Sequence, residues 1–202
     1  MTTMTTPAEQ AEAIREGFDA RVWGIRGDQN ISDTGKIIQI ASLYETEQAK
    51  LTALQSTKDT ATASMKTRMQ TQLFGLPSWA SASDVMSLRD ANDRVSTIDD
   101  PRDAAELLES ARINGDITLA KAILQRAFKE RMSWDPLIQT YGDNNPALVG
   151  SIQTLLTIIN EEAHTTSYRG WMDEASLYTL HEPNEVKQAQ RLNQATPTWN
   201  MR

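Results

Sequence analysis

Residues 100–128 read DPRDAAELLESARINGDITLAKAILQRAF and decide the fold of this chain. Asp100 stands directly before a proline, which is favoured at the first helical position because its missing N–H would have no partner there. The Asn114-Gly115 pair supplies the matching stop, since glycine readily adopts the left-handed conformation that ends a helix. The stretch therefore predicts a helical hairpin that turns at Gly115.

Both arms of this hairpin carry apolar residues at steps of three and four, the spacing of one helix face. Asp135-Pro136 and Asn145-Pro146 repeat the start signal and predict further helices downstream. The second of these begins the clearest apolar stripe of the chain, which consists of Leu148, Ile152, Leu155, Leu156 and Ile159. We expect one buried core made of Leu107, Leu108, Leu124, Phe128, Leu155, Leu156 and Ile159.

Working outward toward the N-terminus, Thr6-Pro7-Ala8-Glu9 is typical of a capping box and predicts a first helix that reaches Val22 or Trp23. A further start signal at Ser81-Ala-Ser-Asp84 predicts a short helix. Trp23, Trp79 and Trp134 lie near the ends of expected elements, and we expect them to fill junctions between helices.

Residues 33–74 contain no proline and predict one long helix. A heptad pattern can be drawn through Ile37, Ile40, Tyr44, Leu51 and Leu54. The same register places Lys58 and Arg68 on the apolar seam, so we expect a packed first half and a solvated second half. Tyr44 and Leu51 are the candidate partner-binding residues of this helix.

The C-terminal part has a different character. Its aromatic residues between 165 and 180 lack a convincing period, and one short polar helix is expected through Leu192. We interpret residues 166–202 as an extended arm that makes few contacts with its own chain. Tyr178 and Trp199 are then candidate anchors that bury against a neighbouring chain.

No strand alternation of useful length occurs, so the predicted fold is all-α. It is a short-helix bundle with a central helical hairpin, a long N-terminal helix and an extended C-terminal arm. The expected parts are an N-terminal helix and turn (1–30), the long helix (31–76), the bundle (77–165) and the arm (166–202).

The net charge of −7 and the pI near 4.9 argue against nucleic acid as the main partner, because such binding depends on Lys and Arg that neutralise phosphates. Cysteine is absent, which excludes disulfides, thiolate metal sites and cysteine nucleophiles. No apolar run approaches the length of a membrane span, and the N-terminus lacks the pattern of a secretory signal. We expect no membrane partner and a location in a virion or the host cytoplasm.

No catalytic constellation is visible. Glu161-Glu-Ala-His164 contains half of a bundle di-iron motif, but His181, the other histidine, offers no second copy. No serine occupies a Gly-x-Ser-x-Gly turn, and the acidic pairs have structural explanations such as helix capping. We therefore expect a protein without enzymatic activity, metal or cofactor.

The segments Asp103–Ala111, Gly115–Leu124 and Trp134–Tyr141 resemble small helical proteins from the structural gene clusters of tailed actinobacterial phages. The resemblance implies a virion-associated or assembly protein without enzymatic activity, in a capsid, connector or tail position. Its partners would be copies of itself and other virion proteins. The alternative is a small acidic adaptor or inhibitor that binds a single bacterial or phage protein.

Overall fold

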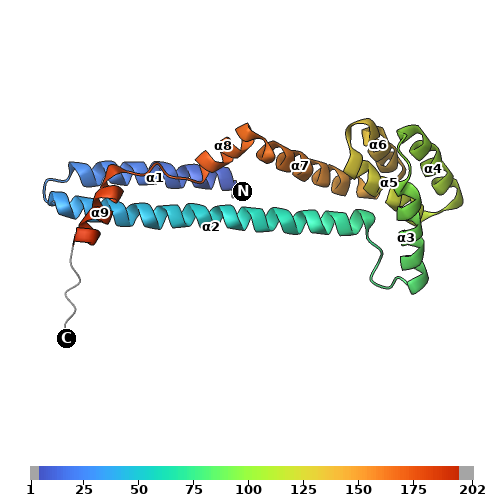
Figure 1. The fold of residues 1–202 in the computed structure, drawn as a ribbon, viewed down its shortest axis with the longest axis horizontal. Helices are drawn as coiled ribbons and strands as arrows, with labels where there is room; N and C mark the ends of the chain where they lie inside the picture. The colour runs from blue at the N-terminus through green and yellow to red at the C-terminus, as the bar shows by residue number, and fades with distance from the viewer. Residues whose placement is uncertain (1–4, 196–202) are drawn as a thin grey trace. The chain divides into compact units, whose positions relative to one another are not determined.

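A computed structural model describes residues 5–195. Within that range the chain forms nine α-helices, two short 3₁₀ helices and no strand, which confirms the all-α fold class (Figure 1). The helices are α1 (Pro7–Gly27), α2 (Asp33–Phe74), α3 (Ala82–Ser96), α4 (Pro101–Asn114), α5 (Ile117–Glu130), α6 (Asp135–Asn144), α7 (Val149–Thr166), α8 (Tyr168–Leu177) and α9 (Asn184–Ala195). The 3₁₀ helices are η1 (Met132–Trp134) and η2 (Pro146–Leu148).

The chain divides into two compact units. The terminal unit combines the residues up to Ala61 with those from Ala163 onward, and the central unit consists of Thr62–Glu162. This division differs from the expected boundaries because the C-terminal segment folds back onto the first two helices. No helix between residues 5 and 195 is long and apolar enough to cross a membrane.

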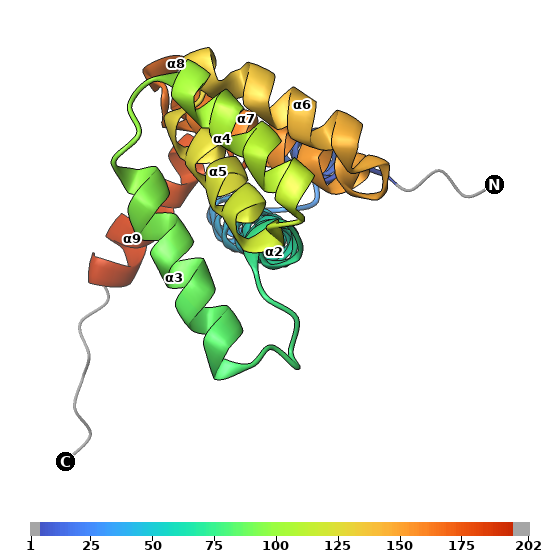
Figure 2. The same cartoon turned by 90° about the vertical axis from the view of Figure 1, so that its right-hand side faces the viewer.

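The central unit is built around α5, which packs against α3, α4 and α6 (Figure 2). All seven residues of the expected core belong to one apolar cluster there. Leu108, Leu124, Phe128 and Leu155 are buried in it, and Leu107, Leu156 and Ile159 pack against it while partly exposed. The apolar stripes of the sequence therefore predicted this core correctly.

The predicted helix signals of the central unit agree with the structure in part. Gly115 has a φ of 67° and ends α4 in the left-handed conformation, as the hairpin pattern predicts. The Asp100 carboxylate accepts a hydrogen bond from the Arg102 N–H and caps α4. The expected caps before Pro136 and Pro146 do not form, because 3₁₀ turns open both elements without a side-chain cap.

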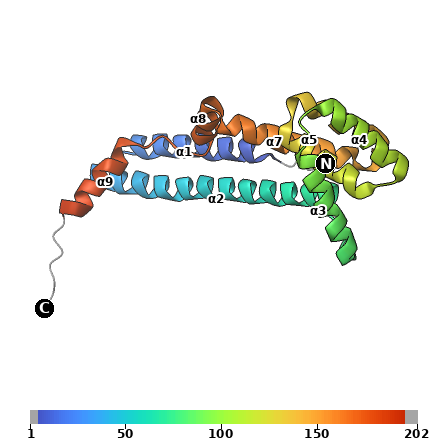
Figure 3. The ribbon, with the colours of Figure 1, turned by 45° about the vertical axis from the view of Figure 1, so that its right-hand side comes forward.

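In the terminal unit, α1 and the first part of α2 form a hairpin (Figure 3). The capping box at Thr6 forms as predicted, with Thr6 Oγ1 accepting from the Glu9 N–H at 3.2 Å. The helix continues past the expected end at Trp23 to Gly27, since glycine near a helix end lowers helix stability without forcing a break.

The expected detached C-terminal arm is wrong for the residues that the structure describes. Residues 168–177 form α8, and the segment after it buries Tyr178, Leu180 and Val186. The Arg26 guanidinium of α1 holds the Glu185 carboxylate of α9 in a two-pronged ion pair, at 2.7 and 2.8 Å. Tyr178, an aromatic residue without a local period, is therefore a core residue, and its partner Gln48 lies more than a hundred residues away in sequence.

Candidate functional site

The predicted partner-binding residues converge on one place, but that place is the core of the terminal unit. Leu51 and Tyr178 are buried there, and Tyr44 packs partly buried with its ring edge-on to Phe18. These three side chains hold α1, α2 and the C-terminal segment together, so they are not exposed anchors for a partner. Trp199 lies outside the described residues.

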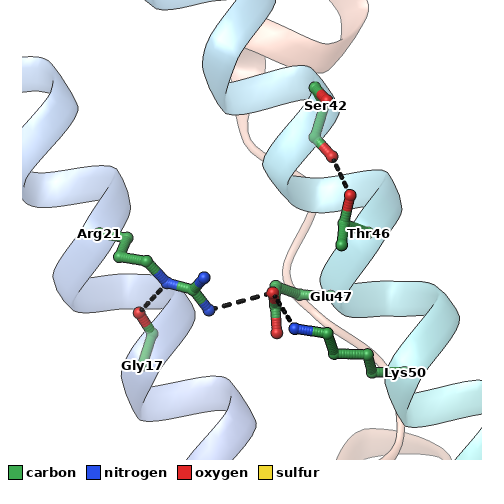
Figure 4. A network of polar contacts seen from close by, with 6 residues as sticks. All are labelled: Gly17, Arg21, Ser42, Thr46, Glu47 and Lys50. Carbon is green, nitrogen blue, oxygen red and sulfur yellow. Dashed lines mark hydrogen bonds and ion pairs between the residues drawn. The ribbon is translucent and has the colours of Figure 1, made fainter.

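A buried carboxylate lies between α1 and α2 (Figure 4). Glu47 has only 2% of its side chain exposed, and its Oε1 is 2.8 Å from the Lys50 ammonium and 3.1 Å from the Arg21 guanidinium. The hydrogen bond from Lys50 and the charge of Arg21 lower the pKa of Glu47, although burial opposes them. Because both cations are half exposed, the network joins the two helices without forming an enclosed reactive site.

The next residue of α2, Gln48, fastens the C-terminal segment. Its amide nitrogen donates to the Tyr178 carbonyl at 3.1 Å, and its amide oxygen accepts from the Leu180 N–H at 2.8 Å. The side chain thus supplies hydrogen-bond partners to two partly buried backbone groups that lie outside the helices. Gln48 is a positioning contact for the turn between α8 and α9.

About three turns further along α2, Lys58 pairs with Glu174 of α8, and its ammonium lies 5.5 Å from the centre of the Tyr178 ring. Burial has the largest single effect and lowers the Lys58 pKa, but the hydrogen bond to Glu174 and the charge of Glu174, with smaller contributions from Tyr178 and Asp59, together raise it above its ordinary value. A lysine that stays charged is suited to structural pairing and unsuited to act as a base near neutral pH.

Sequence reasoning missed these polar contacts, although a signal was present. Glu47 occupies the seam position that the heptad through Tyr44 and Leu51 skips, and Lys58 follows in the same register. A charged residue on an otherwise apolar seam needs a partner of opposite charge when the seam is buried. Glu47 has one local partner, Lys50, but Arg21 comes from α1 and the Glu174 that pairs with Lys58 comes from α8, and no local pattern identifies these two.

The central unit carries an open groove of about 920 Å³ between the end of α2, α3, α5 and α7. The apolar part of its lining consists of the side chains of Phe74, Val95, Phe128, Leu155 and Ile159, among others. Cationic side chains are also present, namely Lys66, Arg126 and Lys129, together with Glu162, which pairs with Lys66. The groove therefore combines an apolar surface with a mostly positive set of charged groups.

The hydroxyl groups that line this groove are engaged within their own helices. Its two lining hydroxyl groups each donate to a backbone carbonyl of their own helix, Thr71 to Thr67 and Ser96 to Asp93. No histidine lines it. Elsewhere, no group of three His, Asp or Glu side chains between residues 5 and 195 is placed to hold a metal ion.

The tryptophans divide into buried and exposed ones, which corrects the expectation for two of them. Trp134 is buried in the central core, where the Arg126 guanidinium lies 5.7 Å from its ring, and so fills a junction as expected. Trp23 and Trp79 are 79% and 84% exposed, so neither fills a junction between helices. Trp23 lies near the end of α1 and Trp79 in the loop between α2 and α3, and both indole rings stay exposed there.

Comparison with known proteins adds no assignment to this geometry. No family model matches the chain, and neither the curated proteins nor the solved structures contain a significant match.

Proposed function

We propose that this chain is a non-enzymatic structural or assembly protein that docks onto other proteins through exposed helix faces. The observation that carries the proposal is the exposure of large aromatic side chains on both units. Trp23, Tyr168 and Trp171 are exposed on the terminal unit, and Trp79 on the central unit. Exposed aromatic residues are enriched in protein interfaces, where they bury a large area at a low cost in side-chain entropy.

Two further observations are consistent with this proposal. The polar clusters of the terminal unit are occupied in joining its own helices, and the groove of the central unit lacks a nucleophile paired with a base. The resemblance of the hairpin region to phage proteins favours a tailed-phage virion or its assembly as the setting. In this proposal, docking is the role of exposed faces of the folded helices and not of the extended C-terminal arm that the sequence predicts.

The proposal is tested by light scattering coupled to size exclusion, with Trp23→Ser, Trp79→Ser and Trp171→Ser as variants. Wild-type chain is expected to form a defined assembly, and at least one variant should lower its molar mass. Because the three side chains are exposed, each variant should keep the wild-type stability within about 0.5 kcal/mol. Trp134→Ser is the matched control, since removing this buried ring should unfold the central unit instead.

A wild-type chain that stays monomeric at its highest soluble concentration would contradict self-assembly. An assembly whose mass is unchanged in all three variants would contradict docking through the exposed tryptophans.

The groove of the central unit favours a second candidate, an adaptor that binds one protein partner. An apolar surface beside Arg126 and Lys129 suits an amphipathic helix with acidic residues on its polar face. A synthetic helical peptide with leucine on one face and glutamate on the other provides the probe. Binding that is lost in Lys129→Glu but kept in Lys187→Glu, a change at an exposed position of α9, would support the adaptor. Equal binding by both variants would exclude the groove.

A further inference from the structure

The turn of the central hairpin contains a chemically labile pair of residues. Asn114-Gly115 is the only Asn-Gly pair in the sequence, and it lies where α4 ends and the chain turns toward α5 (Figure 2). Asparagine is a labile residue, because the backbone nitrogen of the next residue can attack the carbonyl carbon of its side-chain amide. Glycine makes this attack easiest, since it has no side chain that crowds the nitrogen.

The turn is open to water, which the reaction requires. Asn114 and Gly115 are both exposed. Outside the adjacent residues, no atom lies within 4 Å of the position that a Cβ on Gly115 would take. Solvent therefore reaches the turn without any movement of the surrounding helices.

Hydrogen bonds of the folded hairpin hold the two reacting groups apart. The side-chain nitrogen of Asn114 donates to the Ser110 carbonyl at 2.9 Å, one turn back along α4. The Gly115 N–H donates to the carbonyls of Arg112 and Ala111 as part of the helix end. The Gly115 nitrogen must lose its proton and approach the Asn114 side chain before it can attack. Both steps require that these hydrogen bonds open first.

We propose that Asn114 is a site of spontaneous deamidation whose rate is set by opening of the α4–α5 hairpin. In the opened turn, the deprotonated Gly115 nitrogen forms a bond to the side-chain carbonyl carbon of Asn114. The bond from that carbon to the side-chain nitrogen breaks, and the nitrogen takes up a proton from water and leaves as ammonia. Water then adds to either carbonyl of the resulting cyclic imide and opens it. The products are aspartate and isoaspartate, and no atom is oxidised or reduced.

Both products weaken the end of α4. The donor to the Ser110 carbonyl is lost, and a carboxylate takes its place at a helix C-terminus, where the negative end of the helix dipole disfavours it. Isoaspartate also adds a methylene group to the main chain beside Gly115, whose φ of 67° shapes the turn. Because α4 packs against α5, deamidation destabilises the central unit.

Two other asparagines show what the reaction needs and provide internal controls. Asn145 precedes Pro146, whose backbone nitrogen carries no proton and cannot close the ring. Asn30 precedes Ile31, whose β-branched side chain crowds the attacking nitrogen. Both should react more slowly than Asn114 in the same molecule.

Incubation at mildly alkaline pH tests the site and its control by folding. Wild-type chain is kept in buffer and, in parallel, unfolded in guanidinium chloride, and peptide mapping by mass spectrometry follows each asparagine. Asn114 should be the first asparagine to deamidate in the unfolded chain. Its reaction in the folded chain should be slower by about tenfold or more, because attack has to wait for the hairpin to open.

Leu124→Ala separates hairpin opening from the chemistry of the turn. Leu124 is buried in α5, about 10 Å along the helix from its first residue, so its truncation leaves the reacting groups unchanged. The cavity favours opening, and deamidation of the folded variant should accelerate about tenfold or more, with no change in guanidinium chloride. Ile123→Val, a smaller truncation in the same core, should accelerate it by about two- to tenfold and replaces Leu124→Ala if that variant does not fold.

Asn114→Gln is the chemical control, since a longer side chain closes a ring less readily, and this residue should stay unmodified over the same period. Ion exchange separates the deamidated wild-type chain, which carries an additional negative charge. Its thermal melting should occur at a lower temperature than that of the unmodified chain.

The outcomes decide each part of the inference. Preferential reaction at Asn114 that accelerates on unfolding and in the core variants supports it. Faster reaction at Asn145, or none at Asn114 in the unfolded chain, overturns the site. Equal rates in folded and unfolded chain, or no acceleration in a folded core variant, overturn control by hairpin opening. Deamidated chain that melts like the unmodified chain overturns the destabilisation. These results do not depend on association, so they leave the proposed docking function to its own test.

Discussion

The two units of this protein reach a buried core by different routes. In the central unit, short helices that follow one another in sequence pack together, and their apolar stripes form one cluster. In the terminal unit, α1 and α2 receive Tyr178 and Leu180 from the far end of the chain, and charged and amide side chains fasten them. Local apolar periodicity therefore describes the central unit well, whereas the terminal unit depends on contacts between distant segments.

The largest expected effect comes from creating a cavity in either core. Leu124→Ala in the central unit and Leu51→Ala in the terminal unit should each cost about 2–5 kcal/mol, because each leaves a cavity among buried neighbours. Hydrogen exchange should show faster opening in the mutated unit first. If Leu51→Ala leaves both melting and exchange unchanged, the terminal unit does not have the core described.

A second difference between the units concerns backbone geometry. Gly115→Val should destabilise the central unit by about 1–3 kcal/mol, because a β-branched residue is strained at a φ of 67°. Gly150→Val is the matched control: this glycine is also exposed and has open space around it, but its φ is not positive. Denaturant unfolding measures both. Equal effects of the two substitutions would mean that the hairpin turn does not require glycine.

Substitution of Gln48 tests whether hydrogen bonds hold the C-terminal segment in addition to the burial of Tyr178. Gln48→Ala leaves the Tyr178 carbonyl and the Leu180 N–H without their partner and should cost about 1–3 kcal/mol. Gln39→Ala, at an exposed position of the same helix, should be nearly neutral. Exchange of the Leu180 amide is the direct readout, and it should accelerate only in Gln48→Ala. Unchanged protection of this amide would contradict the role of Gln48 in holding the C-terminal segment.

The smallest expected effect is the pH dependence that Glu47 contributes to the stability of the terminal unit. The folded-state pKa of Glu47 lies below its ordinary value of 4.5, so its carboxylate adds stability at pH values above 4.5. That contribution is lost as the pH falls through the folded-state pKa. Glu47→Gln should therefore reduce the loss of stability between about pH 7 and pH 3. Glu45→Gln, on the exposed side of α2, provides the comparison, and identical slopes in the two variants would contradict a specific role for Glu47.

The predicted docking residues illustrate where sequence reasoning failed. Tyr44 and Leu51 were selected from the heptad pattern of the long helix, and Tyr178 was selected because it lacked local apolar neighbours. A heptad seam can be covered by the same chain, and an isolated aromatic residue can have its neighbours far away in sequence. Burial separates the two cases, and it is known only once the chain is folded. The prediction for Trp23 and Trp79 was wrong in the opposite sense, because burial was expected and both rings are exposed. A position near the end of an element does not guarantee that another element covers the side chain.

Sequence by itself determined the all-α class, the span of α2, the caps at Thr6, Ser81 and Asp100, and the hairpin turn at Gly115. Each of these depends on hydrogen bonds and conformational preferences within a few residues, so the information is local. Tertiary structure alone decided the distant partners of Glu47, Gln48 and Lys58 and the return of the C-terminal segment. These features depend on which distant surfaces bury one another, and a pattern of three and four residues carries no information about that choice.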